Sequence, residues 1–386
     1  MNHFLSPIAL VVLVLSSLPV AVADTDPVAE DRVKAFLGEP RIEIQPLFEG
    51  GRFPNIVVTM KGTVLATWGS GTIRAKRSVD GGKTWGPDVP VAPQGIHGGG
   101  TIVDESTGDV LVFVEDEHPP APLTVFRSRD DGQNWEINRI TLDPDSRSNV
   151  PSMHMNEHGI TLRHGEHKGR LLRASRDYGE GNRPKSLFPT HYTNAVYSDD
   201  GGNTWYASEP FSEFGTGEAA IVELSNGRLY YNSRRHWAPD GKSPLRRWAA
   251  WSDDGGATWS EAVICEALPD GPQDTTYGCM GGLVRLPIQE EDVLVYSNCD
   301  SPQGRKRGTI WASFDGGKTW PIKRLVHEAS FAYSSLTAGR PGTATAGNIY
   351  LHFESLKGSK LACFNLSWIL GGEQTGNGTV PASFRH

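Results

Sequence analysis

Short apolar stretches alternate along this chain with turns rich in glycine and aspartate. Residues 56–59, 160–162, 195–197 and 248–251 are apolar or β-branched, and each run ends after a few positions. Runs of this length, bounded by turn residues, are typical of β-strands rather than of helices. The pattern therefore predicts many short strands joined by tight turns, and it excludes folds built from long helices.

The turns share one repeated sequence, Ser-x-Asp-x-Gly-x-Thr-Trp, with Asn134 in place of threonine once. Its aspartate can accept hydrogen bonds from nearby backbone N–H groups, its glycine supplies a positive φ, and its tryptophan can pack the turn against its own sheet. The copies lie 50 to 70 residues apart, which is room for one four-stranded sheet and a loop. Such units bury their faces by stacking, as in a propeller. The five copies begin at Ser78, Ser128, Ser198, Ser252 and Ser313.

Composition and charge fit this picture. The 386 residues include 44 glycines and 11 tryptophans, and the formal net charge of −8 argues against nucleic acid as the main partner. Much of the negative charge lies in the repeated turns, so an acidic chain can still hold a basic central pocket. The aspartates of these turns are Asp80, Asp130, Asp131, Asp199, Asp200, Asp253, Asp254 and Asp315.

The repeated turn resembles the Asp box of the sialidase superfamily of β-propellers. The resemblance implies an all-β fold, a six-bladed β-propeller of four-stranded antiparallel sheets. Five blades would carry an Asp box, and a sixth, at about residues 334–370, would lack one. We expect a signal peptide at 1–23, an N-terminal lead-in at 24–45, the propeller at 46–372 and a C-terminal tail at 373–386.

The N-terminus and the cysteines bear on the compartment. An apolar run at residues 8–15 is followed by small residues at 21–23, which is typical of a cleaved export signal, although an uncleaved anchor is the alternative. The run is short for a membrane span, and no later segment is long and apolar enough to be one. We therefore expect a periplasmic or extracellular protein. Its four cysteines have no metal-ligand spacing. An exported protein could oxidise one or two pairs of them, but we expect buried thiols.

Three arginines match the clamp by which the family holds a substrate carboxylate. Guanidinium groups suit this task because they form paired, charge-assisted hydrogen bonds with carboxylates. The resemblance assigns the clamp to Arg52, Arg234 and Arg305. Arg307 is a rival for the third position, whereas strand alternation should turn Arg235 away from the second.

The resemblance also supplies a nucleophile and its base. Residues 331–336 resemble the family segment that carries the nucleophilic tyrosine, here Tyr333, and Glu218 matches the glutamate that removes its proton. A phenol suits this role because a carboxylate nucleophile would be repelled by the carboxylate of the substrate. Glu354 matches the glutamate that orients the first arginine.

The general acid of the family has no match. No acidic residue lies between Arg52 and Asp80, where the family usually carries an aspartate. His97, which lies among glycines, is the main candidate replacement, with a turn histidine as the alternative interpretation. Residues 116–118 and 176–178 are weaker candidates.

The ligand and the reaction therefore have more than one interpretation. Met280 replaces a polar residue of the family, and Gln273 and Tyr277 are expected to line the same wall. The main hypothesis is a glycoside hydrolase that acts on terminal sialic acid or on sialylated or other acidic glycans, without a cofactor. The alternatives are a lyase of uronic-acid polymers, with His97 and Tyr333 as base and acid, and a non-catalytic carbohydrate-binding propeller.

One string resembles a metal motif. Residues 154–158 read His-x-x-Glu-His, which forms a zinc site only on a helix, where both histidines share one face. Here the string precedes a glycine and a strand-like segment, so we expect no metal site.

Overall fold

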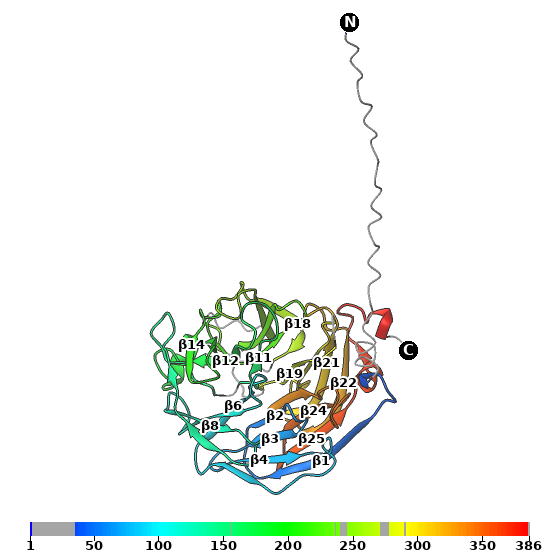
Figure 1. Cartoon of the computed structure of the whole chain (residues 1–386), viewed down its shortest axis with the longest axis horizontal. Coiled ribbons are helices and arrows are strands. Elements are labelled where there is room, and N and C mark those ends of the chain that lie inside the picture. The colour runs from blue at the N-terminus through cyan, green and yellow to red at the C-terminus, as the bar shows by residue number, and fades with distance from the viewer. Residues whose placement is uncertain are drawn as a thin grey trace.

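Six small antiparallel sheets form the molecule in this computed structural model (Figure 1). The structure describes residues 1, 35–154, 156–235, 237–239, 245–270, 278–288 and 291–384. All but Met1 of the predicted signal peptide lies outside these residues. In the described residues, no helix is long and apolar enough to cross a membrane.

The first three sheets follow one another along the chain, and each is a meander of four main strands. The first two contain β2 (Pro54–Val58), β3 (Val64–Trp68), β4 (Ile73–Ser78) and β5 (Val89–Ala92), then β6 (Ile96–Val103), β7 (Val110–Glu115), β8 (Leu123–Ser128) and β9 (Glu136–Asn138). The third contains β11 (Ile160–Thr161), β12 (Leu171–Asp177), β13 (Tyr192–Ser198) and β14 (Thr204–Ala207), and β10 (Thr141–Leu142) adds a parallel fifth strand. The short helix η1 (Lys185–Thr190) lies between β12 and β13.

The remaining sheets repeat this plan, and the last one closes the ring. The fourth and fifth contain β15 (Thr216–Glu223), β16 (Leu229–Arg235), β17 (Arg246–Ser252) and β18 (Val263–Pro269), then β19 (Leu283–Arg285), β20 (Leu294–Cys299), β21 (Lys306–Ser313) and β22 (Ile322–Ser330), with β26 (Glu373–Gln374) as a fifth strand. The sixth contains β23 (Ser334–Ala338), β24 (Ile349–Ser355), β25 (Gly358–Phe364) and β1 (Ile42–Glu49). Two short helices, α2 (Leu366–Leu370) and η2 (Ala382–Phe384), follow.

The innermost strands contact one another in cyclic order around a central axis: β2, β6, β11, β15, β19, β23 and β2 again. The outer strands, such as β1, β4, β8, β14 and β22, lie at the periphery (Figure 1). The predicted six-bladed propeller is thus confirmed, with extra strands in two blades. The sixth blade takes its outermost strand from the N-terminal part of the chain, where β1 pairs with β25 from Ile42 opposite Phe364. This strand spans the predicted boundary at residue 45, and β26 lies in the predicted tail.

Each Asp box links the third and fourth strands of its blade. In the box between β17 and β18, Asp254 accepts hydrogen bonds from the backbone N–H groups of Ala257 and Thr258 at 3.1 and 3.0 Å, and from the Thr258 hydroxyl at 2.6 Å. The Ser252 hydroxyl donates to the same carboxylate at 2.7 Å. Gly256, at φ 87°, has the left-handed backbone that the turn requires. The box is therefore a self-contained turn.

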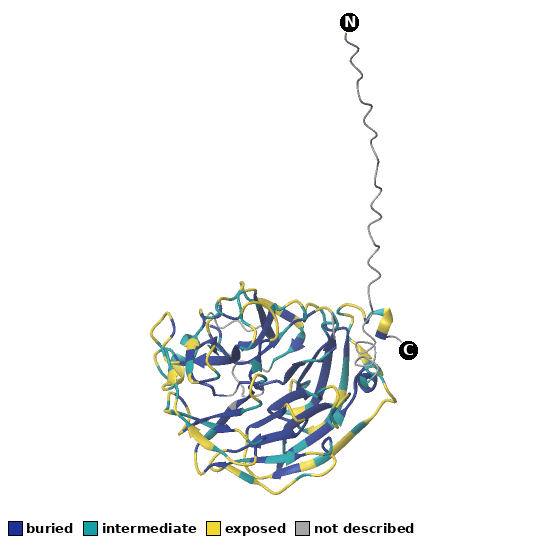
Figure 2. Cartoon of the chain, in the orientation of Figure 1, coloured by how far each residue is buried: buried dark blue, intermediate teal, exposed yellow. Residues whose placement is uncertain are grey.

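The core lies between the blades rather than inside any one of them. The strands β2, β3 and β7 are buried at every position, because neighbouring blades cover both of their faces. Exposed residues gather on the peripheral strands and loops (Figure 2). Cys265, Cys279 and Cys299 are buried thiols, as expected, and Cys363 is a partly buried one.

The Asp-box geometry predicts a contrast between two adjacent aspartates. Asp254→Ala leaves two backbone N–H groups and two hydroxyls without their acceptor, so we expect a loss of about 1–2 kcal/mol in the free energy of unfolding. Asp253 pairs with Arg228 at 3.1 Å across an exposed surface, so Asp253→Ala should cost less than about 0.5 kcal/mol. Urea unfolding of both variants measures the difference, and equal losses would contradict this role of the box.

Candidate functional site

Two cavities lie at opposite ends of the innermost strands. Strand β15 begins next to Glu218, which lines one cavity, and ends at Glu223, which lines the other. Likewise, Tyr333 directly precedes β23 and lines the first cavity, whereas Ala338 ends that strand and lines the second. The two cavities are thus the two mouths of the propeller axis.

The cavity that contains Tyr333 brings together four of the side chains predicted from the sequence. Its volume is about 1020 Å³, and Glu218, Arg234 and Arg305 lie in its wall. Together with Tyr333, these side chains come from three different blades, so only the folded ring brings them together. The wall also contains Glu117, His118, Arg176, Phe188 and Trp237.

Tyr333 forms a direct hydrogen bond with Glu218. Its hydroxyl donates to Glu218 Oε1 at 3.0 Å, and Arg234 Nη1 donates to the other carboxylate oxygen, Oε2. Arg234 Nε in turn donates to Asp270 Oδ1 at 3.1 Å. All four side chains are buried or nearly so, and they form one hydrogen-bonded series across the pocket floor.

The charges around Tyr333 set the protonation states of this series. Burial alone would raise the pKa of Glu218, but the positive charge and hydrogen bond of Arg234, together with Arg176 and Arg305, bring this pKa below its usual value. Burial and the negative charge of Glu218 raise the pKa of Tyr333 well above that of a free phenol. At neutral pH the pair is therefore a carboxylate that accepts a proton and a phenol that holds one.

Arg52 lies beside Tyr333 and is oriented by Glu354. Arg52 Nε and Nη2 donate to the two oxygens of Glu354 at 3.2 and 3.4 Å, and the Arg52 guanidinium carbon lies 5.1 Å from the centre of the Tyr333 ring. Phe53 has a left-handed backbone at φ 69°, and its N–H donates to the same Glu354 at 3.0 Å. This hydrogen bond offsets a conformation that is costly for a bulky residue. Glu354 thus holds the Arg52 turn as well as its side chain.

The structure separates the candidate arginines from their rivals. The Arg305 guanidinium carbon lies 4.7 Å from the Tyr333 ring centre, and Arg305 Nη2 donates to the carbonyl of Gly278 at 3.1 Å. Arg307 instead pairs with Glu328 at 2.7 Å on the surface. Arg235 pairs with Glu213 at 2.9 Å, away from the pocket. Only Arg305 and Arg234 of these four contribute to the wall around Tyr333.

His97 lies apart from this group. Its side chain is fully buried, and it is not among the described residues that line the Tyr333 cavity. Burial, together with the positive charge of Arg173, lowers the pKa of His97 to about 3. A group that is neutral and enclosed in this way is unsuited to protonate a leaving group at the pocket. Gln273 and Tyr277 fall outside the described residues.

Several residues of the wall carried no clear sequence signal. Asp270 follows β18, and nothing near it in the sequence shows that it pairs with Arg234. Arg176, considered above only as part of the segment 176–178, lies near the end of β12, and its Nη2 is 2.9 Å from His191 Nδ1. The ring centres of Phe188 and Trp237 are 4.9 Å apart, so the wall has an aromatic side. The position of Arg176, a charged residue near the end of a buried strand, is the one sequence feature that could have indicated a place in the cavity wall.

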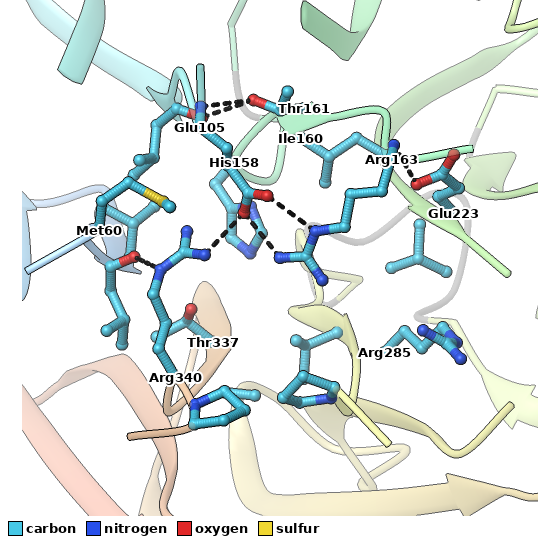
Figure 3. A pocket seen from close by; sticks show the side chains of 18 of the residues that line it. Met60, Glu105, His158, Ile160, Thr161, Arg163, Glu223, Arg285, Thr337 and Arg340 are labelled. Carbon is cyan, nitrogen blue, oxygen red and sulfur yellow. Dashed lines mark hydrogen bonds and ion pairs between the residues drawn. The ribbon is translucent and has the colours of Figure 1, made fainter. Parts of the chain in front are cut away.

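The second cavity is about 710 Å³ and has a different character (Figure 3). Figure 3 shows Glu105 between two arginines: Arg163 donates to both of its oxygens at 2.6 and 2.8 Å, and Arg340 Nη1 lies 2.8 Å from it. Arg285 is engaged by Asp292 at 2.8 Å. Its arginines are thus already neutralised by carboxylates, and none of the described residues lining this cavity is a tyrosine.

The metal-like string is not helical. His154, Glu157 and His158 lie outside any helix, and His158 Nε2 is 2.8 Å from the carbonyl oxygen of Leu336. In the part of the chain that the structure describes, no group of three or more histidine, cysteine, aspartate or glutamate side chains could hold a metal ion.

Fold and pocket together define a β-propeller protein with an arginine-lined cavity around a tyrosine–glutamate pair. Residues 162–346 match the BNR repeat-like domain family. The chain is 32% identical over 378 residues to a sialidase of Micromonospora viridifaciens, covering 86% of this chain and 55% of that relative. It is 26% identical to a sialidase of Bacteroides fragilis (strain YCH46), covering 74% of this chain and 57% of the relative. The chain thus spans about half the length of these relatives.

Solved structures agree with the sequence comparison. The Hadza microbial sialidase Hz136 superposes with a TM-score of 0.63 at 25% identity, covering 82% of this chain and 66% of that one. A leech intramolecular trans-sialidase has the same fold, with a TM-score of 0.65 at 16% identity, covering 85% and 71% of the two chains. The protein belongs to the sialidase superfamily of BNR-repeat propellers.

Proposed function

We propose that this protein is an exported glycoside hydrolase of the sialidase type, which removes terminal sialic acid or a related acidic sugar from glycans. The observation that carries the proposal is the hydrogen bond from Tyr333 to Glu218, 3.0 Å long, inside an arginine-lined cavity. The similarity to two sialidases supports the reaction class. The apolar run at residues 8–15 and the small residues at 21–23 support export.

In the proposed reaction Tyr333 attacks the anomeric carbon of the sugar. Glu218 Oε1 takes the phenolic proton, the new carbon–oxygen bond forms to Tyr333, and the bond to the leaving oxygen breaks. Water then attacks the same carbon and gives a proton to the group that had protonated the leaving oxygen. The bond to Tyr333 breaks, and Tyr333 recovers its own proton from Glu218. Two displacements at one carbon retain its configuration.

The arginines have two roles in this scheme. Arg52 and Arg305 approach the Tyr333 ring from blades one and five, and so they bring positive charge to where a substrate carboxylate would lie. Arg234 comes from blade four and is held between Glu218 and Asp270. It keeps Glu218 ionised, and because it also lines the cavity, its positive charge can attract a substrate carboxylate.

We further propose Glu117 as the acid that protonates the leaving oxygen. Among the described residues that line the Tyr333 cavity, Glu117 and Glu218 are the two carboxylic acids, and Glu218 is committed to Tyr333 and Arg234. His118 is less suited, because burial and the nearby His154 lower its pKa to about 4. Asn182 also donates to His118 Nδ1 at 2.6 Å, which favours the neutral ring. The buried position of His97 likewise speaks against both its acid role and the lyase alternative that depended on it.

The nucleophile is tested with Tyr333→Phe. Because phenylalanine cannot form the glycosyl–enzyme bond, release of a fluorophore from a fluorogenic sialoside should fall by at least about 10³-fold. Binding of free sialic acid, measured by calorimetry, should change by less than about threefold, since the arginines remain. Tyr206→Phe, at an exposed residue of strand β14, is the matched control and should keep full activity. Unchanged turnover in Tyr333→Phe would refute the assignment, whereas a wild-type chain that binds but does not turn over would identify a binding propeller.

The acid is tested with Glu117→Gln on two substrates. A natural sialoside needs a proton on its leaving oxygen, so its kcat should fall by about 10²–10³-fold, whereas an aryl sialoside with a good leaving group should change by less than about fivefold. Asp116→Asn is the control, because this adjacent exposed residue does not line the cavity. Equal effects of Glu117→Gln on both substrates would exclude Glu117 as the acid and leave the role of Tyr333 untouched.

A further inference from the structure

Two cysteine thiols face each other directly behind the Tyr333 cavity. Cys279 lies in the segment that precedes β19, and Cys299 ends β20 of the same blade. Their sulfur atoms are 3.7 Å apart, and both residues are buried. The other two cysteines lie elsewhere, Cys265 on β18 of blade four and Cys363 on β25 of blade six.

The segment of Cys279 carries three backbone contacts that support the site. The carbonyl of Gly278 accepts from Arg305 at 3.1 Å, and that of Cys279 accepts from Arg247 at 3.4 Å. The carbonyl of Met280 accepts from the N–H of Ser334, next to Tyr333, at 3.3 Å. On the other side of the pair, the Cys299 thiol donates to the carbonyl of Phe331 at 3.0 Å. The two thiols therefore lie between a clamp arginine and the nucleophile segment.

We propose that Cys279 and Cys299 are a disulfide-forming pair that locks this wall of the pocket when the chain folds in an oxidising compartment. A disulfide has an S–S distance of about 2.05 Å, so roughly 1.7 Å of closure is needed from the separation of 3.7 Å. Side-chain rotation and small backbone shifts supply such a movement more easily than a rearrangement of the sheet.

The oxidant in this step is a small or protein-borne disulfide. One cysteine thiolate attacks it and forms a mixed disulfide, releasing one thiol of the oxidant. The second cysteine then attacks the mixed disulfide, and the other thiol of the oxidant leaves. Two electrons pass from the pair to the oxidant, and the two protons of the cysteines end on its thiols.

The burial of the pair determines when this exchange takes place. Both thiols are shielded from bulk solvent, and hydrogen bonding to Cys279 together with burial raises the pKa of Cys299. A shielded thiol with little thiolate exchanges slowly. The bond should therefore form during folding and, once formed, should resist reductants that act on the folded chain.

The test compares the full chain produced in a reducing and in an oxidising compartment of one host. Each sample is denatured, its thiols are alkylated without reduction, and its peptides are mapped by mass spectrometry. We expect four alkylated cysteines in the first sample. In the second we expect two, at Cys265 and Cys363, together with one cross-linked peptide joining Cys279 to Cys299. The oxidised protein should also melt about 3–6 °C higher than the reduced one.

Variants separate a specific bond from general oxidation. Cys265→Ser should keep both the cross-link and the difference in melting temperature, whereas Cys299→Ser should lose both. If Cys299→Ser fails to accumulate, the comparison of the two wild-type samples still decides the matter. Four alkylated cysteines in the oxidised sample, or a cross-link that involves Cys265 or Cys363, would overturn the proposal.

Discussion

The buried ion pair between Glu218 and Arg234 is the interaction on which the site depends. A carboxylate at this depth would be protonated without a counter-charge, and a neutral carboxyl group could not take up the proton of Tyr333. Arg234 prevents this, and Asp270 on its other side keeps the guanidinium from being an excess buried charge. The proposed nucleophile, its proposed base and one arginine of the proposed clamp thus form one electrostatic unit, in which Arg234 keeps Glu218 ionised and Glu218 keeps Tyr333 protonated.

The propeller supplies the geometry that this unit needs. Glu218 opens the inner strand of blade four and Tyr333 precedes the inner strand of blade six, so the two meet only because the ring closes. Closure depends on β1, which pairs with β25 and joins the two ends of the chain in one blade. The Asp boxes lie between outer strands, away from the axis. The turns that stabilise the blades therefore lie apart from the side chains around the Tyr333 cavity.

The sequence predicted the fold well because the Asp box is a local structure whose hydrogen bonds all lie within a few residues. Tyr333, Glu218 and Arg234 were also predicted, since each lies in a short recognisable segment. Asp270 was not, because its partner lies 36 residues away. His97 looked available because glycines flank it. However, a side chain at Gly98 would meet the backbone of His154, and one at Gly100 would meet Arg173. The missing side chains of these glycines therefore leave room for close packing of residues from the next blade, not for a ligand.

The most direct test of the central claim is to trap the sugar on the enzyme. A sialosyl fluoride that carries a second fluorine next to the anomeric carbon reacts without an acid, because fluoride leaves unaided, and its covalent intermediate is hydrolysed slowly. Mass spectrometry of the treated chain should show one added glycosyl group, located on the peptide that contains Tyr333. An adduct on another residue, or turnover with inverted configuration and no adduct, would contradict the account.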